Sequence, residues 1–266
     1  MKKLLLASLV TATSFGASAS SVITFDDSSF NNITNSTVVF DEIQFTNDPA
    51  TVTQTDSTPN GSTYGGPDSF VEVGSTDALA FALNNATTNV DPAYEIFYDY
   101  SLIGTSEVVT LPSFPGFAGG DYLSVSFTAN AGTSGLYLDT TVNTMLNTVN
   151  TQLASFTVNS GGTCLVRLSN QIGNCNIDLD ISFAAGYFFD AAGNDLATQP
   201  GAQTASLVVT VDDIGGYSVD YNGGQPTQEF KISHDGHMTF DVPEPASVAI
   251  LGLGLLGFAG ARRRKA

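Results

Sequence analysis

Two histidines, His234 and His237, are the only imidazole side chains in the chain, and three positions separate them in the run Ser-His-Asp-Gly-His-Met. A histidine pair can ligate a metal ion, and a histidine near a serine and an aspartate can act as a general base. The Asp235-Gly236 pair between them is, however, a strong signal for a two-residue hairpin turn, because strand-like residues flank it on both sides. We expect a turn here and no metal site.

Carboxylates are the other candidates for catalysis, because a glycosidase needs only two of them at the right separation. No nucleophile elbow, zinc-protease motif, phosphate loop or dinucleotide fingerprint occurs in the sequence. We therefore expect no enzymatic activity, and a secreted polysaccharide-modifying hydrolase stays open as the alternative. Its candidate glutamates are too many for any one to be singled out: Glu42, Glu72, Glu95, Glu107 and Glu229.

Aromatic side chains could line a sugar-binding cleft, and the chain has nine tyrosines but no tryptophan. Tyrosine is amphipathic and can stack on a sugar ring. Tyr94, Tyr98 and Tyr100 lie on one face of an alternating stretch. We expect them in the core or on the sheet surface, because aromatic pairs are common there.

Two acidic clusters could hold a calcium ion. Asp190, Asn194 and Asp195 surround a glycine turn, and Asp178 and Asp180 share one face of a predicted strand. Neither matches the EF-hand pattern. We expect a solvated loop and a solvated strand face, hence no cofactor, and a calcium-dependent adhesin stays open as a further alternative.

The two cysteines, Cys164 and Cys175, are eleven positions apart and flank a turn-rich segment. In an exported chain such a pair is typical of a disulfide. On adjacent antiparallel strands their Cα atoms would lie near 5.5 Å apart, which suits the bond.

The elements that carry these residues are predicted to be strands. Apolar and polar residues alternate through residues 94–102, 123–128, 176–183 and 207–211, and this period of two indicates antiparallel sheets with one wet face. We expect an all-β fold, an antiparallel β-sandwich or jelly roll, with at most one short helix at residues 142–153. Residues 46–66 are rich in turn-forming types and are expected to form a long surface loop.

Net charge excludes one class of partner. Of eight basic residues only Arg167 and Lys231 lie within residues 20–241, against 25 acidic residues, so this body has a formal charge of −23. Nucleic acid is excluded, because phosphate binding needs a basic surface. The body is expected to be a single domain, which its length of 222 residues permits.

The N-terminus has the pattern of a secretory signal. Lys2 and Lys3 precede an apolar stretch, and Ala17 and Ala19 form an A-x-A cleavage site. Residues 1–19 are therefore expected to be a signal peptide.

The C-terminus, residues 242–266, combines three features. The motif Pro243, Glu244, Pro245 precedes 16 uncharged residues, and a basic stop follows: Arg262, Arg263, Arg264 and Lys265. As a helix the apolar run is roughly 24 Å long, short of the roughly 30 Å hydrocarbon core. The basic end should stay in the cytoplasm, which places the body outside. A permanent single-pass anchor stays open as an alternative.

This tail resembles the PEP-CTERM sorting signal, the substrate of the exosortase membrane proteases of Gram-negative bacteria. The resemblance covers about 25 of 266 residues. It implies transient inner-membrane insertion through the C-terminal helix, cleavage near Pro243, Glu244 and Pro245, and release to the cell surface or into an exopolysaccharide matrix.

Short pieces of the body are similar to the flocculation-associated branch of PEP-CTERM proteins, among them residues 40–42, 162–164, 186–189 and 233–236. This likeness implies a part in cell aggregation through secreted polysaccharide and no catalytic residues. We therefore expect a non-enzymatic surface or matrix protein that associates with exopolysaccharide and promotes biofilm or floc formation.

Overall fold

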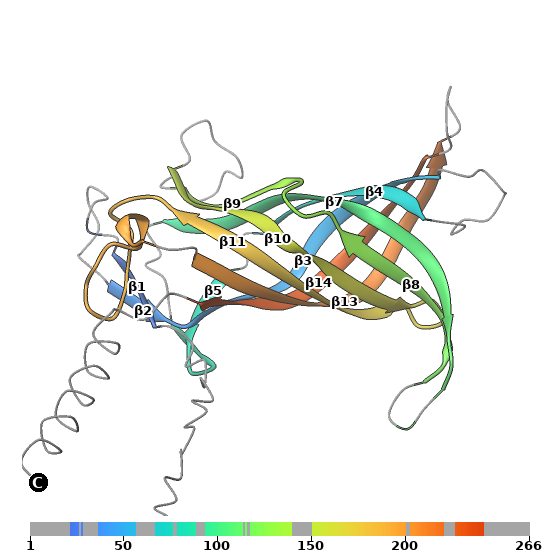
Figure 1. Cartoon of the computed structure of the whole chain (residues 1–266), viewed down its shortest axis with the longest axis horizontal. Helices are drawn as coiled ribbons and strands as arrows, with labels where there is room; N and C mark the ends of the chain where they lie inside the picture. The colour runs from blue at the N-terminus through green and yellow to red at the C-terminus, as the bar shows by residue number, and fades with distance from the viewer. Residues whose placement is uncertain are drawn as a thin grey trace, which may run out of the picture.

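The computed structural model describes residues 22–26, 28, 37–56, 67–76, 79–88, 94–113, 115, 118–139, 151–200, 203–220 and 227–241. Its elements are almost all strands, so the all-β antiparallel prediction is confirmed (Figure 1). They are β1 (Ile23–Asp26), β2 (Thr37–Phe40), β3 (Glu42–Thr55), β4 (Asp68–Thr76), β5 (Leu79–Leu83), β6 (Ala86–Thr88), β7 (Glu95–Leu111), β8 (Gly120–Phe127), β9 (Thr133–Asp139), β10 (Thr151–Arg167), β11 (Ile172–Phe183), β12 (Phe188–Phe189), the 3₁₀ helix η1 (Leu196–Thr198), β13 (Gln203–Asp220) and β14 (Thr227–Asp241).

The main sheet closes on itself. Its strands follow the order β14-β13-β11-β10-β8-β7-β4-β3, and β14 pairs with β3 to complete the ring. All of these pairings are antiparallel. The expected two stacked sheets are therefore two walls of one continuous closed sheet, whose inward side chains meet in a common core.

One position in the ring is shared by two strands, and β3 changes its partner on one side along its length. β8 and β9 both lie between β7 and β10, with β9 taking over where β8 ends. Likewise β3 pairs first with β5 and then with β4.

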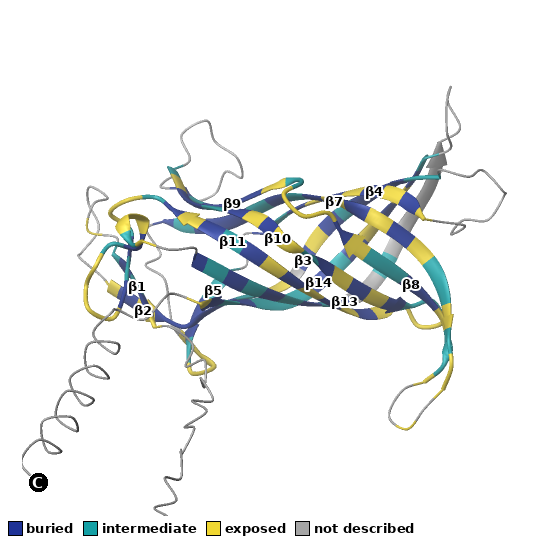
Figure 2. Cartoon of the chain, viewed as in Figure 1, coloured by how far each residue is buried: buried dark blue, intermediate teal, exposed yellow. Residues whose placement is uncertain are grey.

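Alternation along the strands separates a dry interior from a wet exterior. Along β4, β10 and β11, buried and exposed residues follow each other in turn (Figure 2). Side chains of a strand point alternately to opposite faces, so one row fills the closed sheet and the other meets water. The stretches predicted at residues 94–102, 123–128, 176–183 and 207–211 overlap β7, β8, β11 and β13.

A small sheet of β12, β1 and β2 covers one end of the closed sheet (Figure 1). Aromatic rings hold it there: Phe40 of β2 lies 4.4 Å from Phe81 and 5.8 Å from Phe240, centroid to centroid. Phe25 and Phe188 contact each other at 5.3 Å. Asp241, the last described residue, follows Phe240 at this same end.

The predicted loop over residues 46–66 is wrong in its first half, because β3 continues to Thr55. β14 pairs along nearly its whole length, so the backbone is satisfied although the local residues are poor strand formers. Pro49 lies in the one stretch of β3, residues 46–49, that has no ladder partner on the β4 and β5 side. Residues 57–66 lie outside the described part.

The predicted hairpin turn at Asp235-Gly236 is also wrong, because both residues lie inside β14. Gly236 is needed for close packing: a Cβ there would lie 2.5 Å from the carbonyl oxygen of Val208 and 2.6 Å from the ring of Phe45. The expected short helix at 142–153 falls mostly outside the described residues, and its last residue, Leu153, belongs to β10.

Candidate functional site

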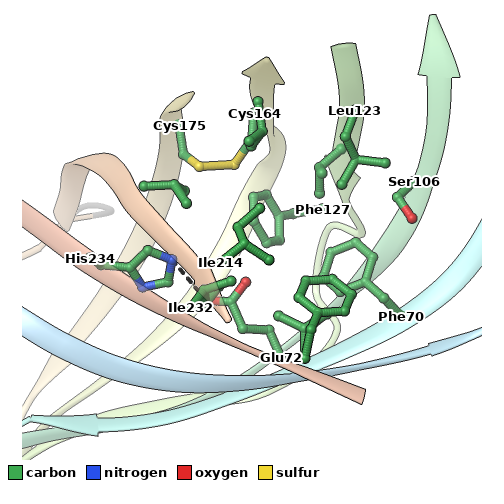
Figure 3. Close-up of a pocket in the computed structure, with 15 residues that line it drawn as sticks. Phe70, Glu72, Ser106, Leu123, Phe127, Cys164, Cys175, Ile214, Ile232 and His234 are labelled. Atoms are coloured by element: carbon green, nitrogen blue, oxygen red, sulfur yellow. Dashed lines mark ion pairs between the residues drawn. A yellow bond between two sulfur atoms is a disulfide. The ribbon is translucent and has the colours of Figure 1, made fainter. Parts of the chain in front are cut away.

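A cluster of polar side chains lies buried inside the closed sheet. Asp48, Glu72, Tyr100 and His234 come from β3, β4, β7 and β14, which are neighbours in the ring. The imidazole Nε2 of His234 lies 3.8 Å from Glu72 Oε1, and its Nδ1 lies 3.3 Å from the hydroxyl of Tyr100. Figure 3 shows the Glu72 carboxyl and the His234 ring directed at each other, with apolar side chains around them.

Strand register brings this cluster together. Glu72 occupies the inward row of β4, where Phe70 precedes it and Gly74 follows it. Gly74 pairs with Tyr100 of β7, and a Cβ on Gly74 would lie 2.4 Å from the tyrosine ring. The glycine therefore leaves the room in which Tyr100 turns its hydroxyl toward His234.

Burial determines the protonation states of the cluster. Burial raises the pKa of Glu72 from 4.5 to about 7, with a hydrogen bond from Tyr100 acting against the rise. Burial lowers the pKa of His234 from 6.5 to about 4. Between about pH 4 and 7 both groups are thus uncharged. Glu72 and His234 therefore contact each other as neutral side chains, although their distance is that of an ion pair.

A second cluster of buried polar side chains lies in the interior, farther from the small sheet of β12, β1 and β2. Gln54 donates from Nε2 to Asp68 Oδ2 at 3.1 Å and to Ser106 Oγ at 3.0 Å, and Gln228 donates to the Gln54 carbonyl. Partners of this kind offset the cost of burying polar atoms. This hydrogen-bond network links the side chains of β3, β4, β7 and β14.

Two small cavities adjoin Glu72 and His234. One of about 40 Å³ is also lined by Ser106 and the two cysteines, and one of about 20 Å³ by Asp48 and Tyr100. Such volumes hold a few water molecules, whereas small-molecule sites typically measure about 300–1,000 Å³. The arrangement can take up and release protons, and it has no room for a sugar substrate.

The disulfide between Cys164 and Cys175 is present and faces the interior (Figure 3). The two residues are direct partners on β10 and β11, as the sequence predicted. Their Cα atoms are 4.0 Å apart rather than the expected 5.5 Å, which is nearer the close spacing of the non-hydrogen-bonded type of antiparallel pair.

The Asp190 loop satisfies its own carboxylate. Asp190 Oδ1 accepts from the backbone of Ala192 and Asn194 at 2.9 and 2.8 Å, and Oδ2 accepts from the Asn194 side chain. Burial would raise the pKa of Asp190, yet these hydrogen bonds lower it overall. Asp195 accepts from Gly186 and Ala197, so donors of the chain itself already contact both carboxylates of the loop.

Four other acidic candidates lie on the outer face of the sheet. Asp178 and Asp180 stand on the wet face of β11, where they accept from Ser160 at 3.4 Å and Asn159 at 2.6 Å. Within the described residues, no group of three or more histidine, cysteine, aspartate or glutamate side chains is arranged to hold a metal. Glu107 and Glu229 are exposed on the outside of the sheet. Tyr98 and Tyr100 are stacked in the core at 5.3 Å, as expected.

Sequence reasoning missed the interior cluster, although a signal was present. Residues 68–76 alternate between inward and outward positions, and Glu72 takes an inward one. His234 likewise follows Phe230 and Ile232 in the inward row of β14. A charged or titratable residue in an apolar row marks a buried polar site, and the mistaken turn at Asp235-Gly236 concealed it.

Residues 241–265 match the PEP-CTERM protein-sorting motif. The chain is a PEP-CTERM exosortase substrate. It is accordingly an exported protein that is sorted to the cell surface. No curated protein and no solved structure matches the chain.

All the residues of this PEP-CTERM signal except Asp241 lie outside the described part of the structure, and so does the predicted signal peptide. Among the residues that are described, no helix is long and apolar enough to cross a membrane. Asp241 ends β14 beside the small aromatic-bound sheet, so the sorting signal begins at that end of the molecule.

Proposed function

We propose that the processed body is a non-enzymatic matrix protein that associates with exopolysaccharide and promotes the cohesion of biofilms or flocs. The sorting motif carries this proposal, because it directs the chain out of the cell and to its surface. A signal peptidase removes residues 1–19, and exosortase cleaves near Pro243, Glu244 and Pro245 after the C-terminal helix has entered the inner membrane.

The interior of the sheet supports a structural role for the body. Its titratable side chains face cavities of tens of Å³, which a polysaccharide cannot enter. The surface available to the matrix is therefore the outer face of the closed sheet. That face carries many carboxylates, which keep the released body soluble through mutual repulsion.

Deleting the gene and restoring it in the same host tests the proposal. We expect the deletion to lower aggregation and the restored protein to be found in the polysaccharide fraction of the matrix. A restored variant with Glu244→Ala and Pro245→Ala serves as the sorting control, and it should stay with the cells. Unchanged aggregation in the deletion strain, with wild-type protein absent from the matrix fraction, would contradict the proposal.

A hydrolase with a carboxylate pair is the principal competitor. Incubating the processed protein with the polysaccharide of its host should release no new reducing ends. If reducing ends appear, and Glu72→Gln abolishes them while Glu107→Gln does not, the interior cluster is catalytic and the matrix proposal is wrong. A calcium-dependent adhesin would instead show a melting midpoint that rises with calcium and falls with chelator.

A further inference from the structure

The strands β8, β10, β11 and β13 lie side by side in the closed sheet (Figure 1), and a depression lies on their outer face. The depression has a volume of about 520 Å³ and is lined mostly by outward side chains of these strands, together with Asn170 of the turn between β10 and β11. This volume is within the range of small-molecule sites, unlike the interior cavities. A ligand could therefore be accommodated here.

Register places three rows of side chains across the depression. Arg167 of β10 is paired with Tyr122 of β8 on one side and with Ile172 of β11 on the other. Leu165 is paired with Asn174 in the next row, and Thr163 with Asn176 in the third. Polar donors and apolar side chains thus alternate over a surface that the rigid ladder fixes.

Arg167 is the only arginine among the described residues, and it forms no ion pair with any of them. Its guanidinium makes a single hydrogen bond, from Nη2 to the carbonyl oxygen of Gly119 at 3.3 Å. The buried Nε has no partner. The body holds 25 acidic residues, yet among the described side chains no carboxylate pairs with the five donors of this guanidinium.

The asparagines of the depression present further donors. Asn176 Oδ1 accepts from Ser206 Oγ at 3.2 Å, and Asn174 Oδ1 accepts from Thr210 Oγ1 at 3.4 Å. With both amide oxygens engaged on β13, the amide nitrogens are left to donate to a ligand. Such a surface complements a molecule rich in acceptors.

Two aliphatic side chains flank these donors. Leu165 is 40% exposed and Ile172 is 47% exposed, which places both among the most exposed large apolar residues of the described chain. Sugar rings have apolar faces that pack on such side chains while their oxygens meet polar groups. Donors and apolar contact together fit a sugar that carries a carboxylate.

We propose that this depression binds an acidic sugar residue, with Arg167 donating to the sugar carboxylate and Asn174 and Asn176 donating to its hydroxyl oxygens. The proposal rests on the proposed function, since it names the site and the sugar class of the polysaccharide association. The body's charge of −23 repels a continuous polyanion. The site therefore suits a polysaccharide in which short acidic stretches are separated by neutral sugars.

Titration of the processed protein, purified from cultures of its own host, with trigalacturonate and with maltotriose tests the site at 0.15 M salt. We expect trigalacturonate to bind more tightly than maltotriose, and Arg167→Gln to weaken it roughly tenfold or more, as for a lost charge-assisted hydrogen bond. Lys231→Gln removes the only other basic residue of the body from the outer face of β14 and should leave binding unchanged. Equal binding of the two sugars, or equal effects of the two substitutions, would overturn the proposal.

Asn176→Asp gives a second variant, because it adds a negative charge to the depression with little change of shape. Asn176→Asp should also weaken the binding of trigalacturonate. The control Ser69→Asp, which adds a negative charge on β4, should not. Sedimentation of the wild type and of Arg167→Gln tests one other occupant, a carboxylate from a second copy of the chain. If the wild type self-associates and Arg167→Gln is monomeric, the depression binds that second copy and the sugar site is refuted.

Failure of this site and failure of the proposed function are distinguishable. If wild type and Arg167→Gln are retained equally by the matrix of the host, the matrix role stands and the site is refuted. If neither is retained, the proposed function itself fails.

Discussion

Glu72 and His234 respond in opposite directions to the same burial. The pKa of Glu72 is raised from 4.5 to about 7, so the folded protein binds a proton that the unfolded chain has released. The pKa of His234 is lowered from 6.5 to about 4, so the unfolded chain binds a proton that the folded protein has released. Between pH 4.5 and 6.5 the two effects on stability nearly cancel, and stability should be greatest there.

Glu72→Gln should remove the contribution of Glu72 to the pH dependence of stability. In the wild type, the contribution of Glu72 is fully present below pH 4.5 and is lost as the pH rises through about 7. The variant lacks this loss, so its free energy of unfolding relative to wild type should improve by on the order of 3 kcal/mol from pH 4.5 to above pH 7. Urea unfolding at several pH values measures the difference. A difference that stays constant with pH, as expected for the exposed control Glu107→Gln, would refute the assignment.

His234→Gln should show the mirror image. The contribution of His234 is lost in the wild type as the pH falls from 6.5 through about 4, because the unfolded chain then takes up a proton first. The free energy of unfolding of the variant should therefore increase relative to that of the wild type as the pH falls over that range. Urea unfolding between pH 6.5 and 4 measures it, and a relative gain at alkaline pH instead would contradict the neutral pair.

At this scale the sequence predicted the disulfide partners and the wet positions of Asp178 and Asp180. It did not predict the meeting of Glu72 with His234, because they are far apart in the chain and come together only when β14 pairs with β3 and β3 with β4. Closure of the ring is a long-range event that no local pattern records.

Among the elements, β10 and β11 are joined both by their ladder and by the Cys164–Cys175 bond. Replacing both cysteines by alanine should lower the free energy of unfolding by about 3 kcal/mol, the value expected for a loop of this length. Chemical denaturation of both proteins with and without reductant measures the effect. Reductant should weaken the wild type and leave the double variant unchanged; equal stability of the two under oxidising conditions would show that the bond contributes nothing.

β7 packs closely against its neighbouring strands at Gly104. A Cβ there would lie 2.2 Å from the carbonyl oxygen of Ser126 and 2.7 Å from the ring of Phe70. Gly104→Ala should therefore destabilise the protein by about 1–3 kcal/mol, since a backbone oxygen cannot move aside as a flexible side chain can. The adjacent exposed residue offers a control, Thr105→Ala, which should be nearly neutral. A melting midpoint unchanged by Gly104→Ala would contradict this packing.

Alternation predicted the regular strands and failed where packing overrode local preference. Gly236 looks like a turn residue, but the ring of Phe45 and the Val208 carbonyl require a glycine within β14. Pro49 looks like a loop residue, but it lies where β3 passes from β5 to β4 and needs no partner on that side. In both cases the deciding contact comes from another strand.

At the scale of the whole molecule, the two ends of the closed sheet differ. The sorting signal begins at Asp241, at the end covered by the aromatic-bound sheet, whereas Arg167 lies at the end of β10 that is farther from this small sheet. A sugar-binding face at Arg167 would thus be directed away from the point of attachment before release. The terminal signals predicted export, the alternation of apolar and polar residues predicted a β fold, and composition predicted an acidic body, whereas the closure of the sheet came only from the structure.

The most direct test of this account is the intact mass of the protein recovered from the extracellular matrix. We predict a chain that begins at Ser20 and ends within residues 242–245, and that therefore lacks the apolar run and the basic residues Arg262 to Lys265. The same measurement on a strain without exosortase should give the full C-terminus in the membrane fraction. Matrix protein that still ends at Ala266 would contradict processing and release, and with them the central claim.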